Sequence, residues 1–319
     1  MLTPASRALI GRRLLQVVPV VVLATFVVFG LIKLLPGDVA VTLAGENATE
    51  QRIAEIRHLY GLDRSFLVQY AGWVWNALHG DLSRSLLSGE PVADAIIRCF
   101  PTTLLIVALA LLLSLAAGIP LGMAAATKPG TWLDSLIMGF ASLGVAVPNF
   151  WLAMILVATF ALAYTIFPAT GSVPFSVNPV DAIRHATLPA AALAAGGVAE
   201  VARQLRSSLV EVLSSQHVRT LHAKGLAPGS ILWKHGLRNV SVNLLTVAGL
   251  LANRLLAATV VVEAVFAIPG MGNLIVRAAI HRDFPVVQGV VFAMVVVVIA
   301  TNLLVDLLAS LLDPRIGHR

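Results

Sequence analysis

Charged side chains are scarce in this chain, at 12% of the residues, against about 25% in soluble domains. Hydrophobic residues make up 58%. This balance excludes an ordinary soluble domain and favours a protein embedded in a lipid bilayer. The net charge of +6 would suit nucleic acid, but the basic residues are scattered and share no face with aromatic residues. We therefore interpret them as determinants of membrane topology.

The motifs of common enzymes are missing as well. None of the four lysines follows a glycine, so the Gly-Lys-Ser/Thr of a phosphate-binding loop is absent. The eight histidines form no His-Glu-x-x-His motif and no close pair, and no Gly-x-Ser-x-Gly occurs. The one cysteine, Cys99, allows neither an intrachain disulfide nor a cysteine metal cluster. The sequence therefore predicts no enzymatic site, no cofactor and no metal.

Six segments are long and apolar enough to cross a bilayer, which takes about 20 residues per helix. They are residues 14–35, 102–125, 135–164, 187–206, 240–263 and 286–312. The third contains Pro148 and is either one kinked span or two spans. The fourth is the weakest, because it is rich in Ala and Gly and ends in charge. We predict an all-α polytopic membrane protein with a single transmembrane domain over residues 1–319.

The distribution of Lys and Arg predicts the orientation of these helices. With the N-terminus inside, the inner segments hold twelve Lys and Arg at more than twice the density of the outer segments, which hold eight. The inner segments are 1–13, 126–134, 203–238 and 313–319, and the outer ones are 36–100, 165–187 and 264–286. Both termini are therefore expected in the cytoplasm. The first apolar run is longer than a signal-peptide core and is interpreted as an uncleaved helix.

The outer segment 36–100 is expected to be helical. Thr49 can cap a first helix that Gly61 ends. The apolar positions of that helix are Ile53, Ile56 and Tyr60, and those of a second helix are Phe66, Tyr70, Trp73 and Ala77. We interpret these helices as a small cap on the outer surface, or as packing against the membrane domain.

The inner segment 203–238 is the longest basic and polar run. Ser214–Lys224 can form a short helix that ends at Gly225 in the left-handed conformation. Pro228 suits the first turn of a second helix, Pro228–Asn239. Two helices joined at a glycine would form a compact projection, the knob, to which another protein can bind. The alternative is a solvated basic loop that only enforces topology.

The knob and other motifs resemble one known family, the inner-membrane permeases of bacterial ABC importers, and within it the dipeptide, oligopeptide and nickel permeases. Ala223-Lys224-Gly225 and His235-Gly236-Leu237-Arg238-Asn239 resemble the coupling loop, or EAA loop, of that family. Further resemblances lie at Leu35-Pro36-Gly37-Asp38, Gly61-Leu62-Asp63, Gly80-Asp81-Leu82, Val147-Pro148-Asn149-Phe150-Trp151, Phe266-Ala267-Ile268-Pro269-Gly270-Met271-Gly272 and Asp313-Pro314-Arg315. The family usually carries Asp-Tyr where this chain has Gln216-His217.

The resemblance implies the type I permease fold and a role as a transport subunit in the inner membrane. It also implies four kinds of partner: a second homologous permease, two cytosolic ATPase subunits, an external substrate-binding protein and the lipid bilayer. The ATPase-coupling residues would be Arg219, Thr220, Leu221, His222, Ala223, Lys224 and Gly225. The substrate would be a short peptide, and nickel or a metal chelate is the alternative.

Three residues are candidates for the translocation pathway. Arg254 falls near the middle of the fifth segment, where an arginine must face protein or water. It either contacts an anionic substrate group or forms a structural ion pair. Pro148 and Asn149 interrupt the third segment and mark either the pathway or a packing kink. Near the inner boundary, Glu200 is expected to pair with Arg203, three residues on.

Two rival functions belong to other classes. A secondary transporter should show inverted repeats and paired intramembrane carboxylates, for which Glu200 and Asp306 are the only candidates. An intramembrane enzyme should carry a Ser/His or paired-Asp site at membrane depth, and none is visible. Neighbouring genes for a second permease, two P-loop ATPases and a binding protein would discriminate these classes from the importer.

Overall fold

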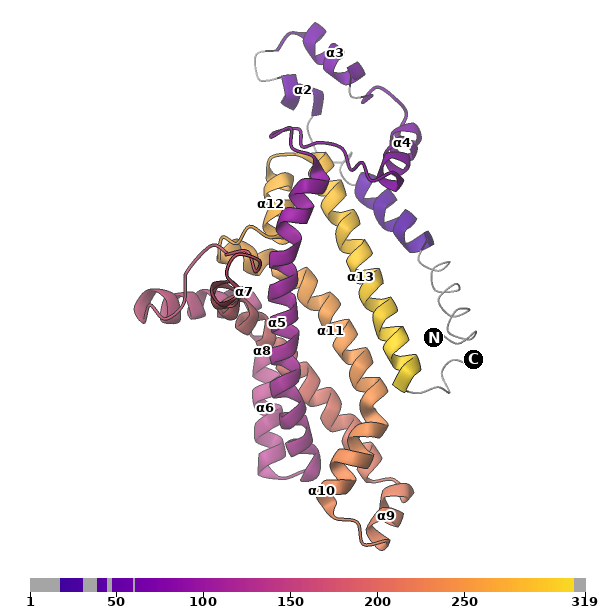
Figure 1. Cartoon of the computed structure of the whole chain (residues 1–319), viewed down its shortest axis with the longest axis vertical. Coiled ribbons are helices and arrows are strands. Elements are labelled where there is room, and N and C mark those ends of the chain that lie inside the picture. Colours follow the sequence, from indigo (N-terminus) through magenta and orange to yellow (C-terminus); the bar gives the residue numbers. More distant parts are fainter. Residues whose placement is uncertain (1–17, 31–38, 45–47, 60, 313–319) are drawn as a thin grey trace. The chain divides into compact units, whose positions relative to one another are not determined.

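The computed structural model describes residues 18–30, 39–44, 48–59 and 61–312, and this part of the chain is helical with connecting loops (Figure 1). The described residues contain no strand, only an isolated bridge between Arg84 and Pro91. After the apolar helix Val18–Gly30, the helices are α2 (Val39–Ala44), α3 (Glu50–Leu59), α4 (Phe66–Leu78), α5 (Val92–Thr127), α6 (Trp132–Ala146), α7 (Asn149–Leu156), the π-helix η1 (Val157–Ala163), α8 (Pro179–Leu213), α9 (Gln216–Ala223), α10 (Pro228–Ser230), the π-helix η2 (Ile231–Gly236), α11 (Leu237–Val265), α12 (Met271–Ile280) and α13 (Phe284–Leu312). The predicted all-α fold class is confirmed.

Three of the described helices are long and apolar enough to cross a membrane, and a fourth crossing is possible if the bent pair α6 and α7–η1 counts as one span. The three are Val92–Thr127, Pro228–Val265 and Phe284–Leu312, and they contain the predicted segments 102–125, 240–263 and 286–312. The predicted segment 187–206 lies within α8, which is long enough but is not among these helices; glycines and the charged Glu200, Arg203 and Arg206 lower its hydropathy. Of segment 14–35, only 18–30 is described, and it is helical.

The contacts divide the chain into two compact units. Of the described residues, the large unit contains 101–272 and 300–312. The small unit contains 18–30, 39–44, 48–59, 61–100 and 273–299.

The helix α8 is the centre of the large unit and packs against α6, α7 and α11. It begins with Asn178, whose side-chain oxygen accepts hydrogen bonds from the next turn, followed by a proline that suits the first helical position. Small residues allow its neighbours to approach closely. A Cβ atom on Gly122 of α5 would lie 2.7 Å from the carbonyl oxygen of Ala202 in α8, and one on Gly118 would lie 2.7 Å from the Cβ of Val201. Such close helix pairs are typical of membrane proteins.

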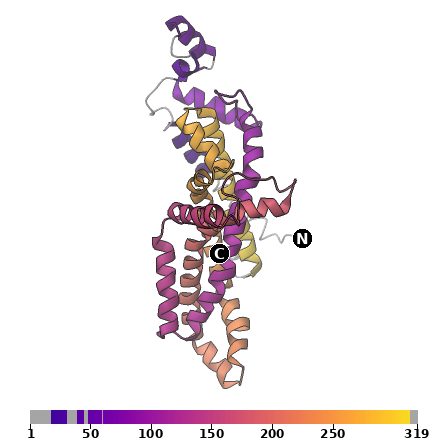
Figure 2. The ribbon, with the colours of Figure 1, turned by 90° about the vertical axis from the view of Figure 1, so that its left-hand side faces the viewer.

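A break at Val147 and Pro148 divides the predicted third segment into two helices. Val147 is extended, as the residue before a proline prefers to be, and Pro148 begins the next helix. The helices on either side of the break meet at 94°, so α7 runs across the direction of α6 (Figures 1 and 2). The question left open by the sequence is answered: segment 135–164 is not one straight span.

The small unit confirms both helices expected in segment 36–100. The Oγ1 of Thr49 accepts a hydrogen bond from the backbone N–H of Arg52 at 3.3 Å, and Gly61, with a φ of +62°, ends α3. Tyr60 lies outside the described residues. The aromatic rings of α4 pack edge-on against those of helix Val18–Gly30, with Phe26 and Phe66 centred 5.2 Å apart.

An ion pair holds the loop after α4 to the beginning of α5. Arg98 donates two hydrogen bonds to the carboxylate of Glu90, one of them from Nη2 at 3.0 Å. These hydrogen bonds lower the pKa of the Glu90 carboxyl below its usual value. Because both side chains remain partly exposed, we expect the pair to orient the loop more than to stabilise the fold.

Candidate functional site

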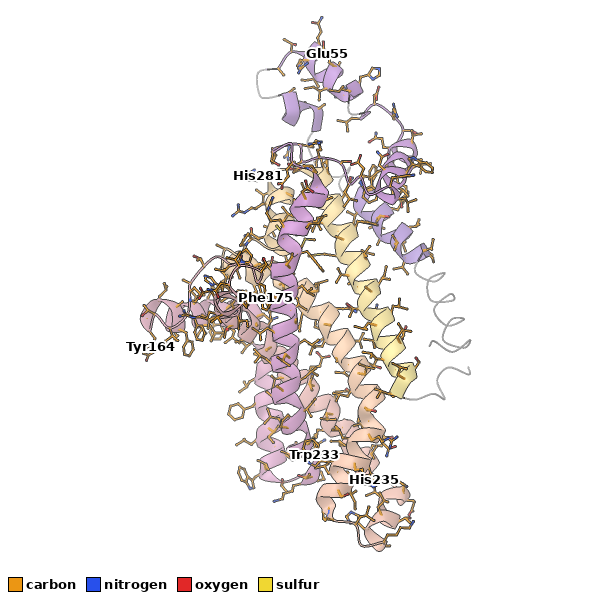
Figure 3. The ribbon with its side chains drawn as sticks, viewed as in Figure 1. Glu55, Tyr164, Phe175, Trp233, His235 and His281 are labelled. Atoms are coloured by element: carbon orange, nitrogen blue, oxygen red, sulfur yellow. The ribbon has the colours of Figure 1, made fainter. Side chains whose placement is uncertain are left out.

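A helical hairpin formed by residues 214–236 contains the seven predicted ATPase-coupling residues and most of the predicted inner segment 203–238. It consists of α9, a short connection over residues 224–227, and α10 with η2. It follows directly from the end of α8 and leads into α11, so two long helices of the large unit meet in it (Figures 1 and 3). The predicted first helix, Ser214–Lys224, is confirmed to within two residues by α9.

The end of α9 has the geometry of a Schellman motif. Gly225 has a φ of +77°. Its N–H donates to the carbonyl of His222 at 2.9 Å, and the N–H of Leu226 donates to the carbonyl of Leu221 at 3.3 Å. The left-handed conformation expected of Gly225 is therefore present, and it turns the chain sharply toward Pro228.

A small apolar cluster fixes α9 to its surroundings. Val218, Leu221 and Ile231 are buried against one another, and Leu226 and Leu213 pack on them. Leu226 thereby adds the apolar contact that accompanies a Schellman motif. The hairpin carries its own core, so it is a structured knob and not a loosely solvated loop.

The seven predicted coupling residues differ in exposure. Leu221 is 9% exposed and belongs to the cluster, so its side chain packs inward. The other six are exposed and form the outer surface of α9 and its end: Arg219, Thr220, His222, Ala223, Lys224 and Gly225. Among the described residues, no carboxylate forms an ion pair with Arg219 or Lys224. The surface is thus basic and open to a partner.

The second half of the hairpin is longer than the sequence predicted. The expected helix Pro228–Asn239 was predicted to end before the fifth apolar segment, but it continues as one helix from Pro228 to Val265. The prediction of its end is wrong, because nothing near Asn239 breaks the helix: its Nδ2 donates to the carbonyl of His235 one turn earlier, at 2.8 Å. The second half of the hairpin is therefore continuous with α11.

One exposed side chain and one ring contact of the hairpin were not singled out by the sequence. Trp233 is 63% exposed, which is high for the largest side chain, and it lies on η2 beside His235 (Figure 3). The rings of His217 and His235 are centred 6.2 Å apart and pack edge to face. His217 stands where the family that the sequence resembles usually has Tyr.

Arg254 forms an ion pair with Glu200. Its Nη1 and Nη2 donate to the two carboxylate oxygens at 2.5 and 3.0 Å. The side chain of Glu200 is 19% exposed and that of Arg254 is 65% exposed. The predicted pairing of Glu200 with Arg203 is wrong, because Glu200 uses both oxygens across to α11. Arg254 therefore has the structural partner that one alternative required, and it also keeps an open face.

The residues at the helix break have separate surroundings. A Cβ atom on Gly196 of α8 would lie 3.9 Å from the Oδ1 of Asn149, so Asn149 faces α8. Pro148 is exposed, as are the neighbouring aromatic residues Phe150 and Trp151. The structure thus places Pro148 and Asn149 at the break before α7, and Arg254 on α11, a helix that packs against α7.

Two buried carboxylates of the large unit were not singled out by the sequence analysis. Asp134 is 4% exposed and accepts hydrogen bonds from Arg206 at 2.7 and 2.5 Å. Glu263 is fully buried near the end of α11 and accepts a hydrogen bond from Thr103 at 2.6 Å. Only Glu200 and Asp306 had been considered from the sequence as carboxylates of the membrane segments, and Glu263 had not been weighed. An acidic residue inside an apolar run was the signal that would have found them.

No group of three or more His, Cys, Asp or Glu side chains within the described ranges is placed to hold a metal ion. The thiol of Cys99 is buried, as expected for an apolar side chain.

Comparison with known proteins gives a consistent set of matches. A family profile described as “Binding-protein-dependent transport system inner membrane component” matches residues 118–318, and one described as “Binding-prot-dependent transport system membrane comp, N-term” matches residues 6–107. A Brucella abortus chain named “Putative peptide transport system permease protein” is 40% identical, over 98% of this chain and 99% of its own length. The Escherichia coli “Dipeptide transport system permease protein DppB” is 35% identical, over 97% and 98%.

A solved structure is similar in fold. A chain of the MetNI methionine ABC transporter, in inward-facing conformations, has a TM-score of 0.58 and 17% sequence identity. The match covers 68% of this chain and 96% of that chain. At this identity the likeness concerns the fold alone.

Proposed function

This chain belongs to the family of binding-protein-dependent transport system inner membrane components, and we propose that it is the permease subunit of an ATP-driven importer of short peptides. It is a multi-pass membrane transport subunit, and ATP hydrolysis takes place on separate subunits. A peptide is proposed as the substrate because the chain is similar, over nearly its full length, to relatives named as peptide and dipeptide permeases. On this proposal, the chain and a second permease form the pathway and open alternately to each side of the membrane.

The partners proposed are a second homologous permease, two cytosolic ATPase subunits and an external substrate-binding protein. The hairpin of residues 214–236 is the proposed docking surface for an ATPase. Its exposed face is basic, its interior is packed, and its second helix continues into α11. A displacement of the knob by an ATPase would therefore act on α8 and α11 as rigid rods, because a packed core does not deform gradually.

The proposed topology places both termini and residues 203–238 in the cytoplasm, and residues 36–100 outside as an external helical segment of the single permease domain. The support is the higher density of Lys and Arg in the inner segments. On this topology, Pro148, Asn149 and Arg254 are proposed to lie along the pathway. The break at Pro148 frees backbone groups that need protein or water, and the open face of Arg254 is able to meet the carboxylate of a peptide.

Uptake measurements test the proposed substrate. The full complex, reconstituted in proteoliposomes with its binding protein, is given a labelled dipeptide or a nickel–histidine complex together with ATP. We expect uptake of the dipeptide that depends on ATP, and no uptake of nickel above vesicles without ATP. Uptake of nickel alone would replace the peptide assignment with the metal-chelate alternative.

A further inference from the structure

A cavity of about 880 Å³ lies within the small unit. Its walls come from α3 and α4, from the loop over residues 81–89 and from the beginning of α13. Its volume falls within the range of small-molecule sites, about 300–1,000 Å³. The cavity is therefore large enough for a molecule of the size of a short peptide or a lipid headgroup.

The charges that line the cavity are mostly positive. Arg57, Arg64 and Arg84 contribute to its wall, against one carboxylate, that of Asp81. Among the described residues, no carboxylate pairs with Arg64. Arg84 is held in place, because its Nη1 donates to the carbonyl of Gly89 at 3.0 Å. Guanidinium groups present planar pairs of donors that match carboxylate and phosphate oxygens.

Trp73 supplies a second and independent observation. Its side chain lines the cavity, is only 9% exposed and packs edge-on against Phe292 at 5.9 Å. The indole Nε1 is buried and has no hydrogen-bond partner among the described residues. A buried donor without an acceptor is unfavourable, and buried tryptophans usually find one. The indole therefore lacks an oxygen acceptor at the wall of a cavity lined by arginines.

We propose that this cavity binds a small organic oxyanion, a carboxylate or phosphate joined to an apolar group. Arg64 binds the charged oxygens, and the Nε1 of Trp73 donates to the ligand after a small rotation of the indole. Phe29, Val68 and Phe284, which also line the cavity, receive the apolar part. Two kinds of molecule carry such an oxyanion: a short peptide, with its free carboxylate, and an anionic lipid, with its phosphate. Neither source requires the pathway residues proposed above.

Calorimetric titration of the full-length permease complex in nanodiscs, without the binding protein, tests the proposal. The probes are the dipeptide Ala-Phe and its C-terminal amide, in nanodiscs of phosphatidylcholine. We expect the free acid to bind and the amide to bind at least tenfold more weakly. Arg64→Gln should weaken binding of the free acid about tenfold or more, because it removes a charge-assisted hydrogen bond. Arg52→Gln is the matched control and should bind like wild type, since Arg52 pairs with Glu55 and does not line the cavity.

Trp73→Phe separates ligand binding from folding. It keeps an aromatic ring against Phe292 and removes the unpartnered donor, so the melting temperature without ligand should fall by no more than the lost packing of the larger ring requires. The affinity for Ala-Phe should fall about fivefold, the value of one neutral hydrogen bond. Unchanged affinity of Trp73→Phe for Ala-Phe would overturn the role of the indole N–H.

Nanodiscs that contain phosphatidylglycerol distinguish the two sources. If Ala-Phe fails to bind but phosphatidylglycerol raises the melting temperature of wild type and not of Arg64→Gln, the oxyanion is a lipid phosphate. If neither probe distinguishes wild type from Arg64→Gln, the cavity is no oxyanion site. ATP-driven peptide uptake by the same preparation is measured in parallel, so failure at the cavity is not confused with failure of the proposed function.

Discussion

Gly225 offers a sharp test of whether the hairpin must keep one shape. Its φ of +77° is a conformation that side chains other than glycine adopt at a cost of about 1–2 kcal/mol. A Cβ atom added there would meet no atom within 4 Å, so the cost of Gly225→Ala lies in the backbone alone. A loss of about 1–2 kcal/mol corresponds to roughly a five- to thirtyfold smaller ratio of ordered to disordered hairpin.

Two variants control for the size of the new side chain. Gly225→Asn should be tolerated better than Gly225→Ala, because Asn adopts the left-handed conformation more readily. Gly229→Ala adds the same methyl group four residues later, where the backbone is helical and no atom lies within 4 Å. It should stabilise the hairpin by about 0.5–1 kcal/mol, since alanine loses less conformational freedom than glycine in a helix.

Hydrogen exchange and coupled ATPase activity measure the effect in the reconstituted complex. We expect the amides of α9 to exchange about five- to thirtyfold faster in Gly225→Ala than in wild type, with a smaller stimulation of ATP hydrolysis by substrate. Equal exchange in wild type and Gly225→Ala would refute the argument. Equal damage from Asn and Ala would also refute it, because backbone conformation would then not be the cause.

Three further predictions concern the large unit and the topology. Arg254→Ala leaves a mostly buried carboxylate partner without its cation, so the yield and the melting temperature of the complex should fall, by about 3 kcal/mol or less in stability; a normal yield with slow transport would favour the pathway role instead. Gly122→Ala should cost about 1–3 kcal/mol through overpacking against α8, whereas Gly139→Ala, with open space around it, should leave the melting temperature of the purified chain unchanged or raised. A cysteine at Ser230 should be labelled only from the cytosol and one at Ser88 only from outside, and reversed labelling would overturn the orientation taken from Lys and Arg.

Local sequence signals predicted the features that depend on neighbours in the chain. The end of α9 at Gly225 and the helix start at Pro228 follow from the conformational limits of glycine and proline. The helix break at Pro148 follows from the same physics. Long apolar runs likewise predicted α5, α11 and α13, because only a helix satisfies its own backbone in lipid.

Contacts between distant residues were not predictable in the same way. Arg206 and Asp134 are 72 residues apart, and Arg254 and Glu200 are 54 apart. The expected pair, Glu200 and Arg203, lies within one helix. Glu200 pairs instead with a residue of α11, because α11 packs against α8. Which charges meet is decided by helix packing, and no periodicity in one segment reveals it.

The central position of α8 was hidden by its composition. Hydropathy ranked the segment 187–206 as the weakest span, because alanine and glycine are less apolar than leucine. The same small residues allow α5, α6 and α11 to pack closely against it. A helix that packs against other helices requires small side chains more than it requires an apolar surface for contact with lipid.

The number of peptides imported per ATP hydrolysed, measured for wild type and for a deletion of Ala223–Gly225, tests the proposed coupling hairpin most directly. The deletion removes the Schellman turn and leaves the helices α8 and α11 intact. We predict that the variant inserts into the membrane and that its complex hydrolyses ATP without importing a labelled dipeptide. Import by the variant at the wild-type number of peptides per ATP would contradict the account.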